Sequence, residues 1–336
     1  MGRRVVRVWG AAAVLLWMLV GPVSATELRV GFIPVLGVAQ LFVIEGEGWD
    51  QKAGFEIVPT QFESGPAMIS ALASGTLDAA YSGIGPMMVA QTRGLDVRVV
   101  AACATGEVAV VARGRLAGLS GGNVAAALAA FKAMEGRPAR IASQPAGSMP
   151  DTVLRYWLET VAKADPTTYD ILGMGIEQTQ QALLAGAVDA ASVREPTVTL
   201  VLMRDPEAKV LAVGNQMMTD QPGTVLTLTG EFMRRAPELA ARLVGLHVRA
   251  TDLLNEKSGS VAEHMQRGLG KGLVPAEVYR RALASVASNF VADPMRIRTA
   301  TGVMQDFQLR LGVLKVPADL DRLFDSSLYL LARSAK

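Results

Sequence analysis

The sequence predicts an α/β protein made of two similar lobes with a cleft between them. Its 336 residues are enough for about two domains. From about residue 28 to residue 230, short apolar strands alternate with amphipathic helices, which is typical of a mostly parallel sheet covered by helices. The segment 71–80 (ALASGTLDAA) also returns as 182–191 (ALLAGAVDAA), with six of the ten positions identical. This separation does not fit a solenoid repeat, so two similar lobes explain it better than a chance likeness of alanine-rich joints.

The first lobe shows clear start and stop signals. Pro34 stops the first strand, because proline cannot donate to a sheet ladder. Ser64 is expected to cap a helix, with Pro66 in the first turn, and Gly75 is expected to end that helix. Strands are expected at residues 28–33, 54–58, 79–81 and 97–102, and helices at 38–47, 64–75 and from 85 onward.

The hinge and the second lobe follow from the same reasoning. Two β-rich segments, 106–113 and 223–229, flank the second copy of the repeat and are suited to be two hinge strands. Residues 116–128 are expected to be a loop that enters a helix, and residues 140–142 a strand. After residue 231 the chain is expected to be mainly helical. The predicted lobes are therefore 26–112 plus 222–336 for the first, which is discontinuous, and 113–221 for the second.

Residues 1–25 have the features of a cleavable signal peptide. A basic start is followed by ten apolar residues, 11–20, and Val23-Ser24-Ala25 supplies the small residues that a signal peptidase needs. Ten residues rise only about 15 Å as a helix, which is half of a bilayer core. We therefore expect cleavage after Ala25 and export of the mature chain to the periplasm.

Composition and charge argue against several functions. The formal net charge is +2, but without the three arginines of the leader the chain has 30 basic and 31 acidic residues. It therefore has no excess of positive charge with which to bind the phosphates of a nucleic acid. Cys103 is the only cysteine, and the sequence contains no HExxH, CxxC, GxSxG or GxxxxGK[ST] motif. We expect no metal, no cofactor and no catalysis, and we expect a monomer.

Four strand-to-helix junctions are expected to face the cleft. Ligands of open α/β sheets bind at the carboxyl ends of strands, where helix N-termini present free N–H groups that suit a small oxyanion. Ser64 and Ser148 could add hydroxyl donors. Any single junction could equally be a plain helix cap, but the convergence of several favours binding. The junctions are residues 34–39, 63–66, 82–86 and 144–148.

Several short motifs together resemble one family of transport proteins, the periplasmic binding proteins of ABC importers for taurine, aliphatic sulfonates and nitrate. The resemblance covers most of the chain from about residue 28 to residue 254. The motifs that carry it are VGFIP at 30–34, FESGPA at 62–67, ALASGTLD at 71–78, GIGP at 83–86, GAVDA at 186–190 and Glu195-Pro196.

The resemblance implies a type II periplasmic-binding fold that closes on its solute and docks on the membrane subunits of an ABC permease. It implies a small organic anion as cargo, with sulfonates first, held by N–H and hydroxyl donors. The residues that we predict to bind this solute are Pro34, Val38, Ser64, Gly65, Ser82, Gly83, Glu107, Gln144, Gly147, Ser148, Arg194 and Glu195.

Two charged residues leave the identity of the solute open. Glu107 resembles an acidic hinge-strand position of taurine-binding members, and it could pair with an ammonium group or lie at the surface. Arg194 stands where these proteins often carry an aromatic residue, and it could clamp an anion, pair with Glu195 or face solvent.

Three alternatives to sulfonate uptake remain. A thiamine-precursor pyrimidine would need aromatic stacking in the cleft, with Phe32, Tyr81 and Trp49 as candidates. An enzyme of the same fold would need a cysteine-rich motif, which a chain with Cys103 alone does not supply. A sensor would use the same fold and cannot be separated from an uptake protein by sequence.

Overall fold

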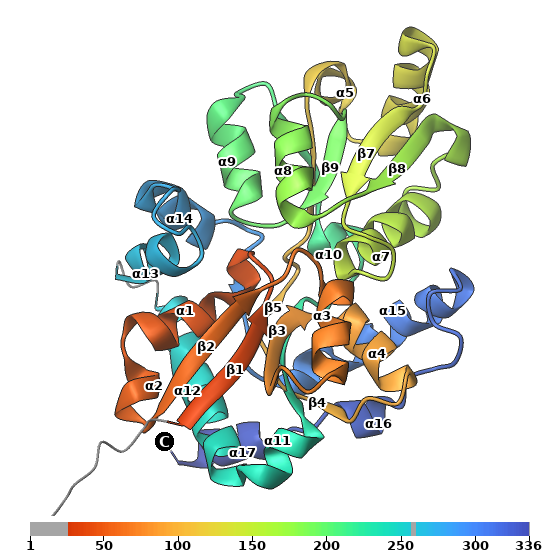
Figure 1. The fold of residues 1–336 in the computed structure, drawn as a ribbon. Helices are drawn as coiled ribbons and strands as arrows, with labels where there is room; N and C mark the ends of the chain where they lie inside the picture. The colour runs from red at the N-terminus through yellow and green to blue at the C-terminus, as the bar shows by residue number, and fades with distance from the viewer. Residues whose placement is uncertain (1–25, 257–259, 336) are drawn as a thin grey trace, which may run out of the picture.

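The computed structural model describes residues 26–256 and 260–335. Two mixed five-stranded sheets organise the chain, with strand orders β2-β1-β3-β11-β4 and β10-β6-β9-β7-β8. Figure 1 shows them as two α/β units, one above the other, each flanked by helices. The predicted α/β class is therefore confirmed. The expectation of a mostly parallel sheet is wrong, because β11 and β6 each run antiparallel to both of their neighbours. No helix in these two stretches is long and apolar enough to cross a membrane.

The first sheet contains the strands expected near the N-terminus. β1 pairs in parallel with β2 and β3, and β11 lies antiparallel between β3 and β4. Leu28 and Val30 are fully buried while Arg29 between them is partly exposed, so the two faces of β1 differ as its sequence predicts. The strands are β1 (Thr26–Phe32), β2 (Phe55–Gln61), β3 (Ala79–Gly83), β4 (Val97–Ala102) and β11 (Thr224–Thr229).

Helices cover this sheet where the sequence places them. Ser64 Oγ accepts a hydrogen bond from the Ala67 N–H (3.4 Å), so the predicted cap of α3 is confirmed. The helices before the hinge are a short 3₁₀ turn (Leu36–Val38), α1 (Ala39–Gly46), α2 (Trp49–Lys52), α3 (Gly65–Ala73) and α4 (Ile84–Thr92).

The second unit repeats the alternation of strands and helices. One expectation is wrong: α5 is helical where a loop was expected, and only Ser120–Asn123 connect it to α6. The strands are β6 (Ala109–Ala112), β7 (Ala139–Ser143), β8 (Tyr169–Gly173), β9 (Ala190–Val193) and β10 (Lys209–Val213). The helices are α5 (Gly114–Leu119), α6 (Val124–Glu135), α7 (Met149–Tyr156) with a π-helical extension (Trp157–Val161), a 3₁₀ turn (Pro166–Thr168), α8 (Ile176–Leu184), α9 (Thr197–Arg204) and α10 (Gly214–Met217).

The internal repeat has the same structure in both units. Each copy ends a helix at a glycine with a φ of +70° and then begins a strand with two alanines. Asp78 Oδ2 accepts the Arg29 N–H (3.1 Å), and Asp189 Oδ2 accepts the Arg140 N–H (2.8 Å), at the same sequence separation. Each aspartate thus ties the start of one strand to its neighbour. The likeness in sequence therefore reflects a common architecture.

Two segments connect the units. The first runs from β4 through β5 (Ala104–Thr105) to β6, and the second returns from α10 to β11. β6 pairs with β9 and β10, so residues 109–112 lie in the second sheet although the predicted first lobe extends to residue 112. We therefore propose that the first crossing spans residues 103–108, and the lobe boundaries otherwise stay a prediction.

Helices after β11 pack mainly on the first unit. They also reach the second unit, because α14 contacts α9 and α15 contacts α7. These elements are α11 (Gly230–Arg235), α12 (Pro237–Asn255), α13 (Ser260–Gly268), α14 (Ala276–Leu283), β12 (Asn289–Phe290, paired with β5), a 3₁₀ turn (Pro294–Ile297), α15 (Arg298–Arg310), α16 (Leu320–Leu323) and α17 (Ser327–Ser334).

His247 on α12 is a structural residue. It is fully buried, and its Nε2–H donates to the Ala102 carbonyl (2.8 Å), since a carbonyl can only accept. Its Nδ1 then accepts from the Tyr81 hydroxyl (3.2 Å). Burial lowers the pKa of His247 to about 4, so the imidazole is neutral at pH 7.

Candidate functional site

The candidate site lies where the carboxyl ends of strands from the two sheets face each other (Figure 1). Loops after β1 and β2 meet loops and helix starts of the second unit. The Leu36 N–H donates to the Glu195 carbonyl (2.8 Å), and the Ile176 N–H donates to the Glu63 carbonyl (3.2 Å). The two units therefore touch across the cleft in a closed arrangement.

A buried ion pair occupies the hinge side of this cleft. Arg194 Nη1 lies 3.3 Å from Glu107 Oε1, and the two side chains are 4% and 3% exposed. Arg194 Nη2 also donates to Gln144 Oε1 (3.5 Å), and the Thr224 hydroxyl donates to Glu107 Oε1 (2.6 Å). Three predicted binding residues are thus brought together. Arg194 neither pairs with Glu195 nor faces solvent, and Glu107 is not a surface charge.

Burial and the neighbouring carboxylate act on Arg194 in opposite directions. Removal from water lowers the pKa of the guanidinium, and the negative charge of Glu107 opposes that change. A buried charge is tolerated only when it is paired, so each member of the pair depends on the other. The pair is neutral as a unit. An anion bound here therefore competes with Glu107 for Arg194, or relies on N–H donors.

Several buried polar atoms around the cleft have no hydrogen-bond partner among the described residues. They are Glu107 Oε2, Ser143 Oγ and Gln308 Oε1. Their residues are at most 2% exposed. Because buried polar groups in folded proteins are nearly always hydrogen-bonded, a cluster of unpaired ones between two lobes indicates a place for a polar solute. Burial also raises the pKa of Glu195.

Helix N-termini provide N–H donors on the same side of each sheet. Ser64 caps α3, and Ser148 caps α7 by accepting from the Asp151 N–H (3.4 Å). Gly147 precedes this cap with a φ of +85°, a conformation that favours glycine. Both serine oxygens thus accept as caps, so their O–H groups remain as donors for an anion, together with the N–H groups of the first turns.

Two further predicted residues are glycines that allow close packing at these helix starts. A methyl group at Gly65 would overlap the ring of Pro86, and one at Gly83 would lie 2.9 Å from the Cβ of Met149. The second contact joins the two units. Side chains larger than hydrogen would therefore force the helix starts apart.

The remaining predicted residues are not brought into contact with the ion pair. Val38 is fully buried within the core of the first unit, and Pro34 is partly exposed at the start of its loop. The Ser82 hydroxyl donates to the carbonyl of Gly83 (3.3 Å). A direct role in binding stays a prediction for these three.

Sequence reasoning missed several polar residues of the site. Thr224 could have been inferred, because it lies in the segment 223–229 that was expected to be a hinge strand; the structure places this segment in the first sheet as β11. Gln221 accepts from the Val108 N–H (3.2 Å) and lies 3.2 Å from the sulfur of Met149, but no motif marks it. Gln308 on α15 donates to Thr152 of α7 (2.9 Å). The two residues lie far apart in the sequence, so no local pattern indicates their contact.

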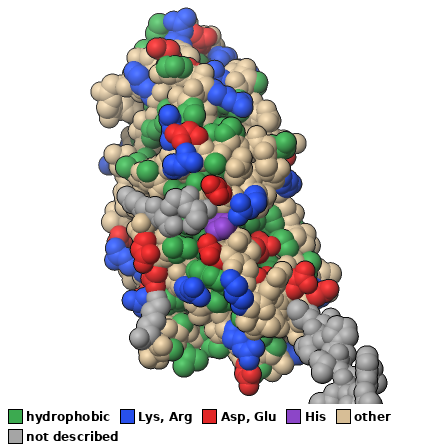
Figure 2. All heavy atoms as spheres, turned by 90° about the vertical axis from the view of Figure 1, so that its left-hand side faces the viewer, with side chains coloured by type: hydrophobic (Ala, Val, Ile, Leu, Met, Phe, Trp, Pro, Cys, Tyr) green, Lys and Arg blue, Asp and Glu red, His purple; other side chains and the backbone are tan. Residues whose placement is uncertain are grey.

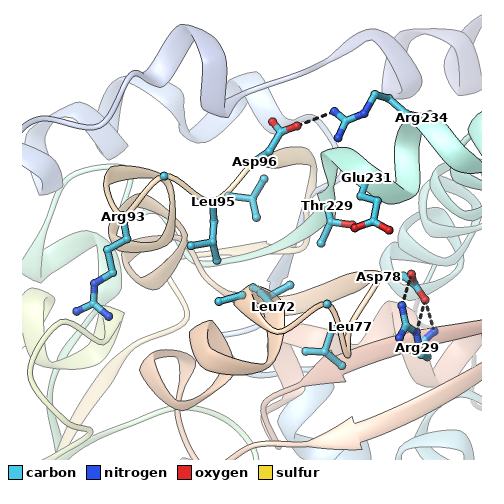
Figure 3. A pocket seen from close by; sticks show the side chains of 14 residues that line it. Arg29, Leu72, Leu77, Asp78, Arg93, Leu95, Asp96, Thr229, Glu231 and Arg234 are labelled. Atoms are coloured by element: carbon cyan, nitrogen blue, oxygen red, sulfur yellow. Dashed lines mark hydrogen bonds and ion pairs between the residues drawn. The ribbon is translucent and has the colours of Figure 1, made fainter.

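A separate cavity of about 360 Å³ lies at the other end of the first sheet from the candidate site (Figure 3). Four of its six charged side chains form two ion pairs, and Arg93 and Glu231 are the other two. Arg29 binds Asp78 (2.8 Å) and Arg234 binds Asp96 (2.7 Å), as the dashed lines in Figure 3 show. The two pairs anchor strand starts, and the cavity does not belong to the candidate site.

The described residues offer little for catalysis or metal binding. They contain no group of three or more His, Cys, Asp or Glu that could hold a metal ion. Cys103 is fully buried, and burial raises the pKa of its thiol well above the ordinary value. On the face that Figure 2 shows, Lys and Arg side chains are interleaved with Asp and Glu, which does not form a basic nucleic-acid surface.

The sequence model of the NMT1-like family matches residues 21–267, more than half of the chain. The chain belongs to the NMT1-like family. This NMT1-like protein is 26% identical over 237 residues to the nitrate import ATP-binding protein NrtC of Synechococcus elongatus. The match covers 68% of this chain and spans only 35% of that relative's length. A putative aliphatic sulfonates-binding protein of Bacillus subtilis is 25% identical over 228 residues, which cover 67% of this chain and 64% of that relative. With this match, the resemblance to substrate-binding proteins of nitrate and sulfonate importers is confirmed.

Solved structures confirm the type II periplasmic-binding fold of this NMT1-like protein. The nitrate-binding protein NrtA of Synechocystis PCC 6803 has a TM-score of 0.78 at 16% identity, covering 93% of this chain and 89% of that one. The aliphatic sulphonate binding protein SsuA of Escherichia coli has a TM-score of 0.70 at 18% identity, covering 91% and 100%. A point mutant of DszB in complex with biphenyl-2-sulfinic acid scores 0.66 at 16% identity, covering 93% and 100%.

Proposed function

We propose that this chain is the solute-binding protein of an ABC importer, which captures a small organic anion and delivers it to membrane permease subunits. A sulfonate is the first candidate. The observation that carries this proposal is the buried polar cluster of Arg194, Glu107 and Gln144 between two lobes, in a member of the NMT1-like family. The predicted signal peptide, residues 1–25, lies outside the described residues, and the periplasm is the compartment that we propose.

Closure of the lobes is the proposed mechanism. A solute that contacts both lobes binds the closed form more tightly than the open form, so it shifts the population toward closure. The hydrogen bond between Leu36 and Glu195 is one contact that closure would complete. The permease would then recognise the closed form.

The polar groups of the cleft support an anion that also carries a hydrogen-bond donor. The N-termini of α3 and α7 and the guanidinium of Arg194 favour an anionic head. Glu107 Oε2 is buried and has no partner among the described residues, so it suits an ammonium or other N–H group. Taurine and ethanesulfonate differ by such a group, and comparing them isolates its contribution.

The environment of the aromatic residues favours this class over a pyrimidine. Tyr81 is fully buried against His247, and Phe32 makes an edge-to-face contact with Phe42 at 5.2 Å. Trp49 lies under the guanidinium of Arg249 at 3.8 Å. These three residues are already engaged in the first unit, so stacking on a pyrimidine would require them to leave their partners.

We also propose binding in place of catalysis. Cys103, the only cysteine of the sequence, and His247 are both buried within the first unit. His247 already uses both ring nitrogens. The likeness to the DszB mutant concerns the fold alone and does not assign a reaction to this chain.

A thermal-shift screen of residues 26–336 tests the proposal. The panel contains ethanesulfonate, taurine, nitrate, sulfate, a phosphonate, a small carboxylate and hydroxymethyl-pyrimidine. A ligand at a thousandfold its Kd adds about 4 kcal/mol to folding and raises the Tm by several degrees. A shift with sulfonates supports the proposal, a shift with the pyrimidine alone replaces the solute, and no shift with any compound overturns the anion class.

A further inference from the structure

The chain crosses between the two sheets near one edge of each sheet. The crossings leave the first sheet from β4 and β11, which are neighbours at one end of the strand order β2-β1-β3-β11-β4. They enter the second sheet at β6 and β10, which are neighbours at one end of the order β10-β6-β9-β7-β8. β2 and β8 are therefore the edge strands farthest from the crossings in the strand order. The segments that follow these two strands separate most when the lobes rotate about the hinge.

Glu63, which follows β2, binds the start of α8, which follows β8. Its Oε2 accepts a hydrogen bond from the Glu177 N–H (3.1 Å), and its carbonyl accepts one from the Ile176 N–H (3.2 Å). These two N–H groups belong to the first turn of α8, where no earlier carbonyl of the helix can pair with them. Gly175, the N-cap residue of α8, has no side chain that could accept from them. Glu63 of the first unit therefore supplies the cap that α8 of the second unit lacks.

Gln61 separates two carboxylates at this contact. Gln61 Nε2 lies 3.2 Å from both Glu63 Oε1 and Glu177 Oε1, and its two N–H groups can donate one hydrogen bond to each. Closure therefore brings two like charges together only with a shared donor between them. The charge of Glu63 also lies at the positive end of the α8 dipole, which stabilises it. Both glutamates are exposed, so water can replace these contacts when the lobes separate.

We propose that Glu63 is a latch, which holds together the cleft edges farthest from the hinge and so raises the affinity for the solute without touching it. The inference rests on the proposed function, because a latch of this kind raises affinity only when the solute binds the closed form. A helix cap changes an equilibrium constant by about fivefold. Loss of the Glu63 side chain should therefore lower the closed population, and with it the affinity, by about that factor.

Titration calorimetry of residues 26–336 with ethanesulfonate measures this effect. We expect Glu63→Ala to weaken binding about fivefold, and Glu63→Gln, which keeps an oxygen acceptor without the charge, to weaken it less. Glu56→Ala is the matched control, because Glu56 is an exposed glutamate near the start of β2, at the other end of the strand from the cleft. Its affinity should stay within twofold of the wild type. Equal affinities of Glu63→Ala and the wild type, or the same loss in the control, would overturn the latch.

A distance between the lobes distinguishes failure of the latch from failure of the proposed function. Cys103 is fully buried, so spin labels can be attached to cysteines introduced at exposed positions of α3 and α8, Ser70→Cys and Gln181→Cys. We expect pulsed electron paramagnetic resonance to show a larger open fraction in Glu63→Ala than in the labelled chain that keeps Glu63. A purely structural role would lower the free energy of unfolding and leave this fraction unchanged.

The measurement is made without solute and again with ethanesulfonate. Equal distance distributions in the two chains under both conditions would overturn the latch, even where ethanesulfonate binds. Different distributions without solute, combined with no binding of any compound of the panel, would support the contact between the lobes and refute the proposed solute class. Equal distributions combined with no binding would refute both.

Discussion

Replacing Arg194 by methionine should destabilise the fold strongly, because it leaves Glu107 charged and without its counter-ion. The two side chains are 4% and 3% exposed and 3.3 Å apart. The Thr224 hydroxyl would be the remaining partner that the structure gives this carboxylate. Removing one member of a buried ion pair costs about 3–5 kcal/mol, whereas an exposed pair is worth about 0–1 kcal/mol. We therefore expect Arg194→Met to lower the free energy of unfolding by about 3–5 kcal/mol.

Urea unfolding at pH 7.5, followed by circular dichroism, measures this loss. The double variant Arg194→Met, Glu107→Gln should recover most of the stability, because it removes the unpaired charge along with its partner. Arg234→Met is the matched control: this arginine pairs with Asp96 but is 70% exposed, so its loss should cost less than about 1 kcal/mol. A loss below about 1 kcal/mol for Arg194→Met, or a double variant no more stable than the single one, would refute the reasoning.

Three further predictions concern the caps, the buried histidine and the close approach at Gly37. Ser64→Ala combined with Ser148→Ala should weaken ethanesulfonate binding by about 1–3 kcal/mol in calorimetry, and an unchanged Kd would remove both caps from the site. His247 has its pKa lowered to about 4 from an ordinary 6.5, so the unfolded chain takes up a proton first and stability is lost as the pH falls from 6.5 through 4. This loss amounts to about 3 kcal/mol. The free energy of unfolding, measured with urea at pH 7 and at pH 4.5, should therefore change less in His247→Gln than in the wild type. An equal change in the two proteins would contradict the assignment. A methyl group at Gly37 would overlap Glu107 Oε2, so Gly37→Ala should weaken taurine binding in calorimetry, and wild-type affinity would show that this oxygen plays no part.

Much of the fold could be predicted because it depends on local signals. The serine cap of α3, the proline in its first turn and the apolar runs of the first strands each report on neighbouring residues. The repeat was informative for a further reason. Asp78 and Asp189 occupy matching positions and fix matching strand starts, so a similar local sequence specified a similar joint twice.

The predicted site was more difficult because it depends on contacts between distant segments. Helix caps at Ser64 and Ser148 were readable locally, but the partner of Arg194 was not, since Glu107 lies 87 residues earlier. Gln308 has no local signal at all, because only the packing of α15 on α7 brings it to the cleft. The α5 helix was missed for a different reason: its glycines favour a loop locally, and burial of Leu116 opposes that tendency.

The position of the unpaired acceptors also separates the solutes within the proposed class. Glu107 Oε2 is an oxygen that needs a donor, and neither nitrate nor sulfate supplies one at neutral pH. A sulfonate that carries an N–H group would satisfy such an atom while its head meets the helix N-termini. Taurine should therefore bind more tightly than ethanesulfonate, and the ratio of their affinities measures how much Glu107 contributes.

Small-angle X-ray scattering of residues 26–336, with and without a saturating sulfonate, tests the central claim most directly. The claim is that a solute bridges two lobes and holds them in the closed arrangement, in which the Leu36 N–H donates to the Glu195 carbonyl. We predict a smaller radius of gyration with the sulfonate than without it. A radius that does not change although calorimetry shows one-to-one binding would contradict capture by closure, and it would place the solute on one lobe only.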